Sequence, residues 1–200
     1  MKSFGTLLFV ILFALSSTGQ IKPMDHLFKD RQNEYSPYLT VGMQLTQLWF
    51  TPTFNGEIGT GVLINKTFSI GYDYTKSFLN IFLPSSKQDG QIEMTKNALH
   101  LEYTLWPKQK IHLSFPLEIG MGNLGIKGIA TSKITGKPGF NFFEPGVVIE
   151  KNFWKYAKFG IGAKYRYAFN VDYCGLGSSD ISRFTAVLFV KFGKFTFPKH

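Results

Sequence analysis

The sequence predicts an all-β fold, an eight-stranded antiparallel up-and-down transmembrane β-barrel, and three observations support this prediction. Residues 111–122 alternate without interruption between apolar side chains and polar or small ones. Because strand side chains point to opposite faces in turn, this segment has one apolar and one polar face. The pattern recurs in seven further segments. The N-terminal residues have the composition of an export signal, which indicates a protein of the cell envelope.

That export signal is a predicted signal peptide over residues 1–19. Lys2 supplies the positive charge, residues 4–15 form an apolar core, and Ser17 and Gly19 are the small residues before the cleavage site. The core is too short for a spanning helix, and no later segment reaches the ~20 apolar residues that one needs. We therefore expect an N-terminal periplasmic segment over 20–36 and an outer-membrane barrel domain over 37–197.

The predicted strands follow the alternation and the turn residues along the chain. They cover residues 38–49, 54–64, 67–78, 97–106, 110–122, 141–151, 156–170 and 182–195. Most of them reach the ~9–11 residues that a tilted transmembrane strand needs. Links after the second, fourth and sixth strands are short, whereas those after the third, fifth and seventh are long. This asymmetry is typical of barrels with periplasmic turns and extracellular loops, although the link after the first strand is also short.

The apolar faces are expected to point outward into lipid. Phenylalanine occurs 21 times, more than a water-soluble domain of this size could bury, whereas a barrel can turn aromatic rings toward the membrane. The last strand is apolar on both faces. We assign Phe184, Leu188 and Phe192 outward, because this choice leaves Lys191 inside.

The opposite faces predict a polar network inside the barrel. Its expected members are Glu57, Asp73, His100, Glu102, His112, Glu118, Glu144, Glu150, Lys158, Lys164, Arg166 and Lys191. Glycines lie between these charges, and eight strands leave a lumen just wide enough to be filled by side chains, so we expect no open pore. Pairing partners in the sixth and seventh strands whose numbers sum to 308 would set Glu150 against Lys158 and Glu144 against Lys164.

His112 and Ser114 share the inward face of the fifth strand. A register in which partner numbers sum to 216 would set Glu102 opposite Ser114, which gives the outline of a hydrolytic site. Some eight-stranded barrels are lipid A deacylases with a His-x-Ser pair, but they present that pair to the membrane. We therefore favour a hydrogen-bonded interior over catalysis at these three residues.

Other site chemistry finds little support in the sequence. The four histidines have no recognised metal-ligand spacing, the glycines near residue 120 lack the context of a phosphate loop, and the single Cys174 cannot form an internal disulfide. The net charge of +9 suits anionic lipid or lipopolysaccharide, as do Lys127, Lys133 and Lys137 in one long loop. We expect no cofactor, no metal, no nucleic acid, and a monomer.

The C-terminal third contains four characteristic segments, residues 143–150, 159–167, 179–182 and 191–195. In these segments the chain resembles a family of small outer-membrane β-barrel proteins of Bacteroidota. The resemblance implies an eight-stranded barrel of the OmpA and OmpX type with no assigned activity, whose last strand ends in a phenylalanine read by the barrel-assembly machinery. Either Phe195 or Phe197 is that residue here.

The leading functional interpretation is a non-enzymatic integral protein of the outer membrane, with a structural or interaction role and loops facing the outside. The alternatives are a lipid A-modifying hydrolase, a narrow porin-like channel, and a soluble periplasmic binder of lipocalin type. The last would exchange the faces, with an apolar cavity inside and a polar surface outside.

Overall fold

The computed structural model describes residues 34–48, 51–77, 81–82, 90–128, 139–171 and 177–195. The strands are β1 (Tyr35–Leu48), β2 (Thr51–Ile64), β3 (Phe68–Ser77), β4 (Ile81–Phe82), β5 (Gly90–Leu105), β6 (Ile111–Gly128), β7 (Gly139–Trp154), β8 (Ala157–Tyr165), β9 (Tyr167–Phe169) and β10 (Phe184–Gly193). A short helix, α3 (Ser178–Ile181), precedes β10. No helix in these ranges is long and apolar enough to span a membrane.

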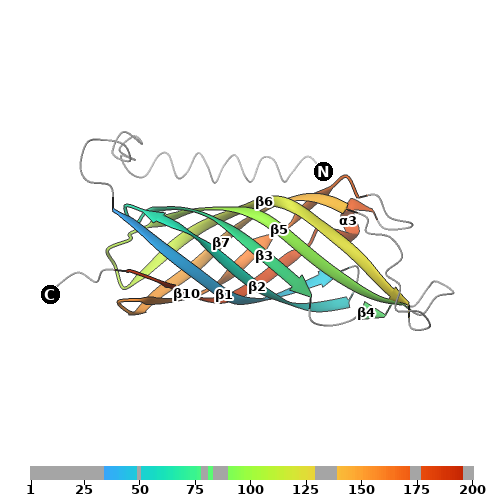
Figure 1. Ribbon diagram of the computed structural model, residues 1–200, viewed down its shortest axis with the longest axis horizontal. Helices are drawn as coiled ribbons and strands as arrows, with labels where there is room; N and C mark the ends of the chain where they lie inside the picture. The colour runs from blue at the N-terminus through green and yellow to red at the C-terminus, as the bar shows by residue number, and fades with distance from the viewer. Residues whose placement is uncertain are drawn as a thin grey trace, which may run out of the picture. The chain divides into compact units, whose positions relative to one another are not determined.

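All strand pairs are antiparallel and belong to one sheet, which runs in the order β3-β2-β1-β10-β8-β7-β6-β5-β4 (Figure 1). β3 also pairs with β5, and this pairing closes the sheet into a barrel. β9 continues β8 beyond Arg166, and β4 is a two-residue ribbon on β5. Eight strands therefore form the wall, which confirms the predicted fold class.

The break between β8 and β9 has a cause in the sequence of the neighbouring strands. Pro145 of β7 would face Tyr165, and this pair is missing from the ladder between β7 and β8. Pro116 of β6 would likewise face Gly146, and this pair is missing from the ladder between β6 and β7. Proline has no backbone N–H, so it cannot donate to the strand ladder. The register is nevertheless the same on both sides of the break.

The barrel has a turn end and a loop end. At the turn end, residues 65–67, 106–110 and 155–156 connect β2 to β3, β5 to β6, and β7 to β8. Asn65 and Lys66 both have positive φ, at 51° and 62°, and asparagine tolerates this left-handed conformation better than most residues. The three predicted short links are thus confirmed. The loop end carries the β1–β2 connection and the longer connections that follow β3, β6 and β9.

Several strands are longer than the sequence predicts. β5 begins at Gly90 rather than at residue 97, β6 continues to Gly128, and β1 begins at Tyr35 inside the expected N-terminal segment. In β5 and β6, pairing at the loop end continues where outward residues become polar, so apolar alternation predicted these two strands too short. The extra residues of β1 lie at the turn end, where Tyr35 pairs with Ile64. The predicted signal peptide, Cys174, Lys133, Lys137 and Phe197 lie outside the described residues, as does most of the segment over 20–36.

Two predicted registers are wrong by two residues. Between β5 and β6, Thr104 faces Ser114 and Glu102 faces Pro116, so partner numbers sum to 218. Between β7 and β8, Gly146 faces Lys164 and Glu150 faces Gly160. In the second pair an irregularity between Asn152 and Trp154 shifts the register next to the turn. A shift of two residues keeps every side chain on its predicted face.

The predicted faces are confirmed. Apolar side chains on the outer wall are exposed, among them Val41, Ile58, Leu99, Ile161 and Phe192. Inward positions along the same strands are buried, and many of them are charged. This arrangement is the reverse of the one that a soluble lipocalin-type binder requires, so that alternative is wrong.

Gly162 of β8 lies directly against the backbone of the neighbouring strand β7. A Cβ atom at this position would stand 2.2 Å from the carbonyl oxygen of Val147 and 2.7 Å from the Cα of Val148, both of which belong to the backbone. We expect Gly162→Ala to lower the free energy of unfolding by about 1–3 kcal/mol through overpacking. Urea unfolding in detergent micelles measures this loss. Gly139→Ala is the control, because its Cβ would meet nothing closer than 3.8 Å, and a similar loss for both variants would contradict the explanation.

Candidate functional site

The barrel interior gathers the predicted polar residues in one place. All twelve are buried, and Glu144, Glu150 and Arg166 have no exposed surface at all. Six carboxylates, four lysine or arginine cations and two histidines belong to this set, so most of the negative charges have a positive group among the twelve. Because a buried charge is stable only when it is paired and hydrogen-bonded, the contacts among these groups determine what the interior can do.

The first group of contacts, the turn-end cluster, is centred on Glu150 of β7. Its carboxylate forms an ion pair with Lys191 Nζ at 3.1 Å and accepts a hydrogen bond from Lys158 Nζ at 3.5 Å. Lys191 also donates to Glu102 at 2.7 Å. The predicted contact between Glu150 and Lys158 thus exists, although the two residues are not direct partners in the ladder.

The candidate hydrolytic residues join this cluster in a different arrangement from the predicted one. Ser114 Oγ donates to Glu150 Oε2 at 3.1 Å, and His112 Nε2 contacts the same oxygen at 3.0 Å. Ser114 also lies 3.1 Å from the hydroxyl of Thr104, whereas Glu102 pairs with Lys191. The hydroxyl and the imidazole therefore share one acceptor. A hydrolytic site needs the base to face the nucleophile instead, and this one is fully buried.

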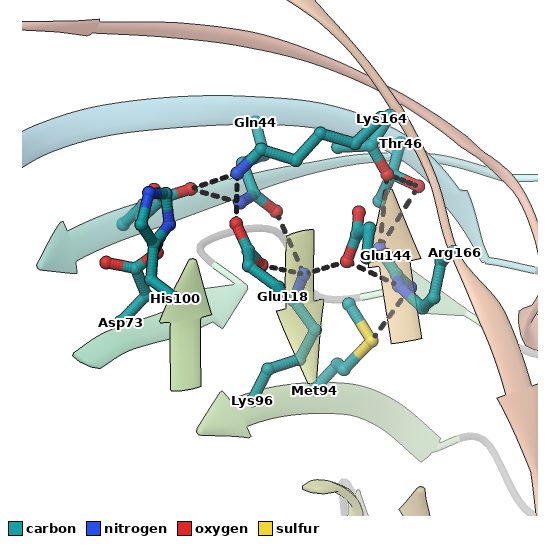
Figure 2. A network of polar contacts seen from close by, with 12 residues as sticks. Gln44, Thr46, Asp73, Met94, Lys96, His100, Glu118, Glu144, Lys164 and Arg166 are labelled. Atoms are coloured by element: carbon teal, nitrogen blue, oxygen red, sulfur yellow. Dashed lines mark hydrogen bonds and ion pairs between the residues drawn. The ribbon is translucent and has the colours of Figure 1, made fainter. Parts of the chain in front are cut away.

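The second group, the central cluster, connects opposite walls of the barrel (Figure 2). Lys96 Nζ of β5 donates to Glu144 Oε2 at 2.7 Å, and Arg166 Nε donates to the same oxygen at 3.4 Å. Lys164 pairs closely with Glu118, not with Glu144 as the predicted register implied. Glu144 is thus the shared counter-charge of two buried cations.

His100 joins the two clusters. Its Nδ1 lies 2.7 Å from Asp73 Oδ2, and its Nε2 lies 3.7 Å from Glu102 Oε2. Ligand atoms of Asp73, His100 and Glu118 lie within 4.8 Å of one another, which is close enough to hold a metal ion. However, Asp73 already bonds to His100, and Glu118 already bonds to Lys164, so a cation would compete with existing contacts and with a nearby ammonium group.

Two hydrophobic layers enclose these clusters. The loop-end layer consists of Met94, Ala98, Leu124, Phe140, Phe142, Ala168 and Ile181. The turn-end layer consists of Tyr38, Leu63 and Phe195. Ile181 belongs to helix α3 and is fully buried, so the segment before β10 contributes to the closure of the loop end. At the turn end, Lys158 Nζ stands 4.5 Å from the centre of the Phe195 ring.

Lys96 and Gln44 belong to the central cluster, although neither is among the residues predicted for the interior network. Lys96 lies in a range that was assigned to a loop, yet it is only 1% exposed and holds Glu144. Its signal was present, because Lys96, Ala98, His100 and Glu102 continue one inward alternation. Gln44 donates to Glu57 and accepts from Lys96 at 3.3 Å. Gln44 is uncharged, so the sequence does not distinguish it from other polar residues as a member of the network.

Comparison with known proteins identifies the architecture. The crystal structure of Neisserial surface protein A matches with a TM-score of 0.57 and 13% identity, over 82% of this chain and 100% of that chain. The N-terminal β-barrel domain of Pseudomonas aeruginosa OprF matches with a TM-score of 0.51 and 13% identity, over 81% of this chain and 99% of that chain. No protein-family model and no curated protein matches the sequence. These likenesses show that the chain has the fold of small eight-stranded outer-membrane β-barrels.

Proposed function

We propose that this protein is an integral outer-membrane β-barrel whose sealed interior is structural and which acts through the surfaces that it exposes. The observation that carries the proposal is the charged interior enclosed between two hydrophobic layers. The charged groups of the interior pair with one another, and the outer wall of the barrel exposes apolar side chains to its surroundings. We expect the protein to be a monomer, a client of the barrel-assembly machinery, and a neighbour of outer-membrane lipid and lipopolysaccharide.

The outer wall supports residence in a membrane. Exposed aromatic side chains lie near both ends of the barrel, with Trp106, Trp154 and Tyr156 at the turn end and Tyr167 and Phe169 toward the loop end. Tryptophan and tyrosine prefer the two interfaces of a bilayer, and outer-membrane barrels carry such girdles around an apolar band ~25 Å tall. The predicted signal peptide agrees with this location.

The interior argues against a porin-like channel. Ions that crossed the barrel would have to pass the loop-end layer, then break the pairs that Glu144 and Glu150 make, and then pass the turn-end layer. Each of these pairs is buried, and separating one of its members leaves an uncompensated charge. The lipid A hydrolase alternative is likewise disfavoured, because Ser114 and His112 both bond to Glu150 inside the barrel.

Reconstitution of the purified full-length chain into planar bilayers tests this function. We expect the protein to resist carbonate extraction from lipid vesicles, as an integral protein does, and to give no stable conductance steps in the bilayer. Heat-denatured protein is the control for adventitious leaks. Large, steady channels would contradict the sealed interior, and extraction by carbonate would contradict insertion into the membrane.

A further inference from the structure

A groove of about 510 Å³ lies on the outer wall where β5, β6 and β7 approach the loop end. Its volume is within the range of small-ligand sites. Four asparagines contribute to its lining, together with Tyr72, Leu99, Ile119 and Met121. Such a concentration of amides is unexpected on a wall whose other exposed positions are mostly apolar or aromatic.

The strand registers give the position of these residues along the barrel wall between its turn end and its loop end. Asn97 faces Met121, Met121 faces Asn141, and these three therefore form one row across β5, β6 and β7. In the row nearer the middle of the barrel, Leu99 faces Ile119. In the row nearer the loop end, Asn123 faces Gly139. The groove thus passes from an apolar floor near the middle of the wall to an amide-lined part above it.

Short side chains between long ones create the hollow. The long side chains here are Tyr72 and Met121, which are exposed by 50% and 67%. The short ones beside them are Asn97, Asn141 and Gly139. The Tyr72 hydroxyl donates to Asn97 Oδ1 at 2.5 Å, and this bond leaves both N–H groups of the amide available as donors. The groove therefore offers donors and acceptors beside an aromatic ring.

We propose that this groove binds a lipid with a sugar headgroup in the outer leaflet, an inference that rests on the proposed membrane location. An amphiphile fits the two parts of the groove, with its acyl chain along Leu99 and Ile119 and its headgroup among the amides. The described residues that line the groove include no charged side chain, so the site cannot neutralise a phosphate. Amide donors and acceptors do match the hydroxyl groups of a sugar, which act in both ways.

The test compares lipids that differ only in the headgroup. The full-length chain in detergent is titrated with a galactosyl diacylglycerol and with a phosphatidylglycerol of the same acyl chains, and bound lipid is counted by native mass spectrometry. Lipid A, a phosphorylated sugar lipid, forms a third arm. We expect the galactolipid to bind at least about tenfold more tightly than phosphatidylglycerol, which corresponds to one or two hydrogen bonds.

Two variants locate the binding. Asn97→Leu combined with Asn141→Leu removes the amides and is expected to abolish this tenfold preference, while Gly139→Val fills the hollow and is expected to weaken both lipids. Thr60→Leu, an exposed polar position on the β2 wall, is the control and should change neither. Unfolding on heating, seen as a mobility shift in gels, verifies that each variant folds.

The outcomes separate the two proposals. Equal binding of galactolipid and phosphatidylglycerol by a chain that inserts into vesicles would overturn the groove assignment and leave the membrane location standing. A preference that survives the double asparagine variant would overturn it as well. Failure of the wild-type chain to insert into vesicles would instead contradict the proposed function. Tight binding of lipid A beside the galactolipid would identify the saccharide as the recognised part in both.

Discussion

Replacing Glu144 by glutamine is expected to lower the free energy of unfolding of the barrel by about 3–5 kcal/mol, the range found when one partner of a buried ion pair is removed. Glu144 is fully buried, and one of its oxygens holds Lys96 at 2.7 Å and Arg166 at 3.4 Å. Glutamine keeps the shape of the side chain but removes its charge, so two buried cations lose their common partner. Urea unfolding of the protein in detergent micelles, followed by tryptophan fluorescence, measures the loss.

Glu93→Gln is the matched control for this experiment. Glu93 pairs with Lys76 at 2.6 Å on the outside of the barrel, and the lysine side chain is 50% exposed. Solvent-exposed pairs contribute at most about 1 kcal/mol, so the same chemical change should have a small effect there. Equal losses for Glu144→Gln and Glu93→Gln would show that the interior is hydrated and that its charges do not depend on one another.

Ile161→Lys is expected to destabilise the protein by about 2–4 kcal/mol in lipid vesicles, as charges do at the middle of a transmembrane barrel wall. Ile161 is 55% exposed on the outer wall and lies between Ile149 and Leu188 in the sheet. A charge at this position would have to leave water for hydrocarbon. Equilibrium unfolding in vesicles by guanidinium measures the effect.

A lysine substitution at the end of the barrel is the control for the one at the middle of the wall. Tyr156→Lys lies in the β7–β8 turn, at the end of the barrel, where a cation near the interface costs about 0–1 kcal/mol. Ile161→Lys should therefore destabilise the protein more than Tyr156→Lys in lipid. If both variants prove equally harmless, the apolar wall does not face hydrocarbon, and the membrane location fails with it.

The sequence predicts the barrel well because its information is periodic. Alternation with period two determines the face of a residue wherever it persists, and an error of two residues in register leaves that face unchanged. Glu150 is an example, since it is buried as expected although its partner in β8 is Gly160 rather than Lys158. The ends of the strands are harder to predict than the faces of their residues, because strand pairing at the loop end continues where the outward side chains are no longer apolar.

Partners inside the barrel could not be predicted in the same way. The groups that meet Glu144 come from β5 and from the break between β8 and β9, on different sides of the lumen. Such contacts depend on the tilt of the strands and on the length of each side chain, and neither has a periodic signal in the sequence. Lys164 was assigned to Glu144 because the predicted register was two residues off, whereas it meets Glu118.

Lys191 has a consequence for the order of folding. It belongs to β10, the last strand, and it holds Glu102 and Glu150, which come from β5 and β7. A chain in which β10 has not yet paired with β1 therefore leaves both carboxylates without this partner. Because burying an isolated charge costs free energy, a sheet in which β10 has not yet paired with β1 is destabilised relative to the closed barrel. Closure of the barrel should thus be cooperative, with the last strand completing the electrostatic balance that the earlier ones lack.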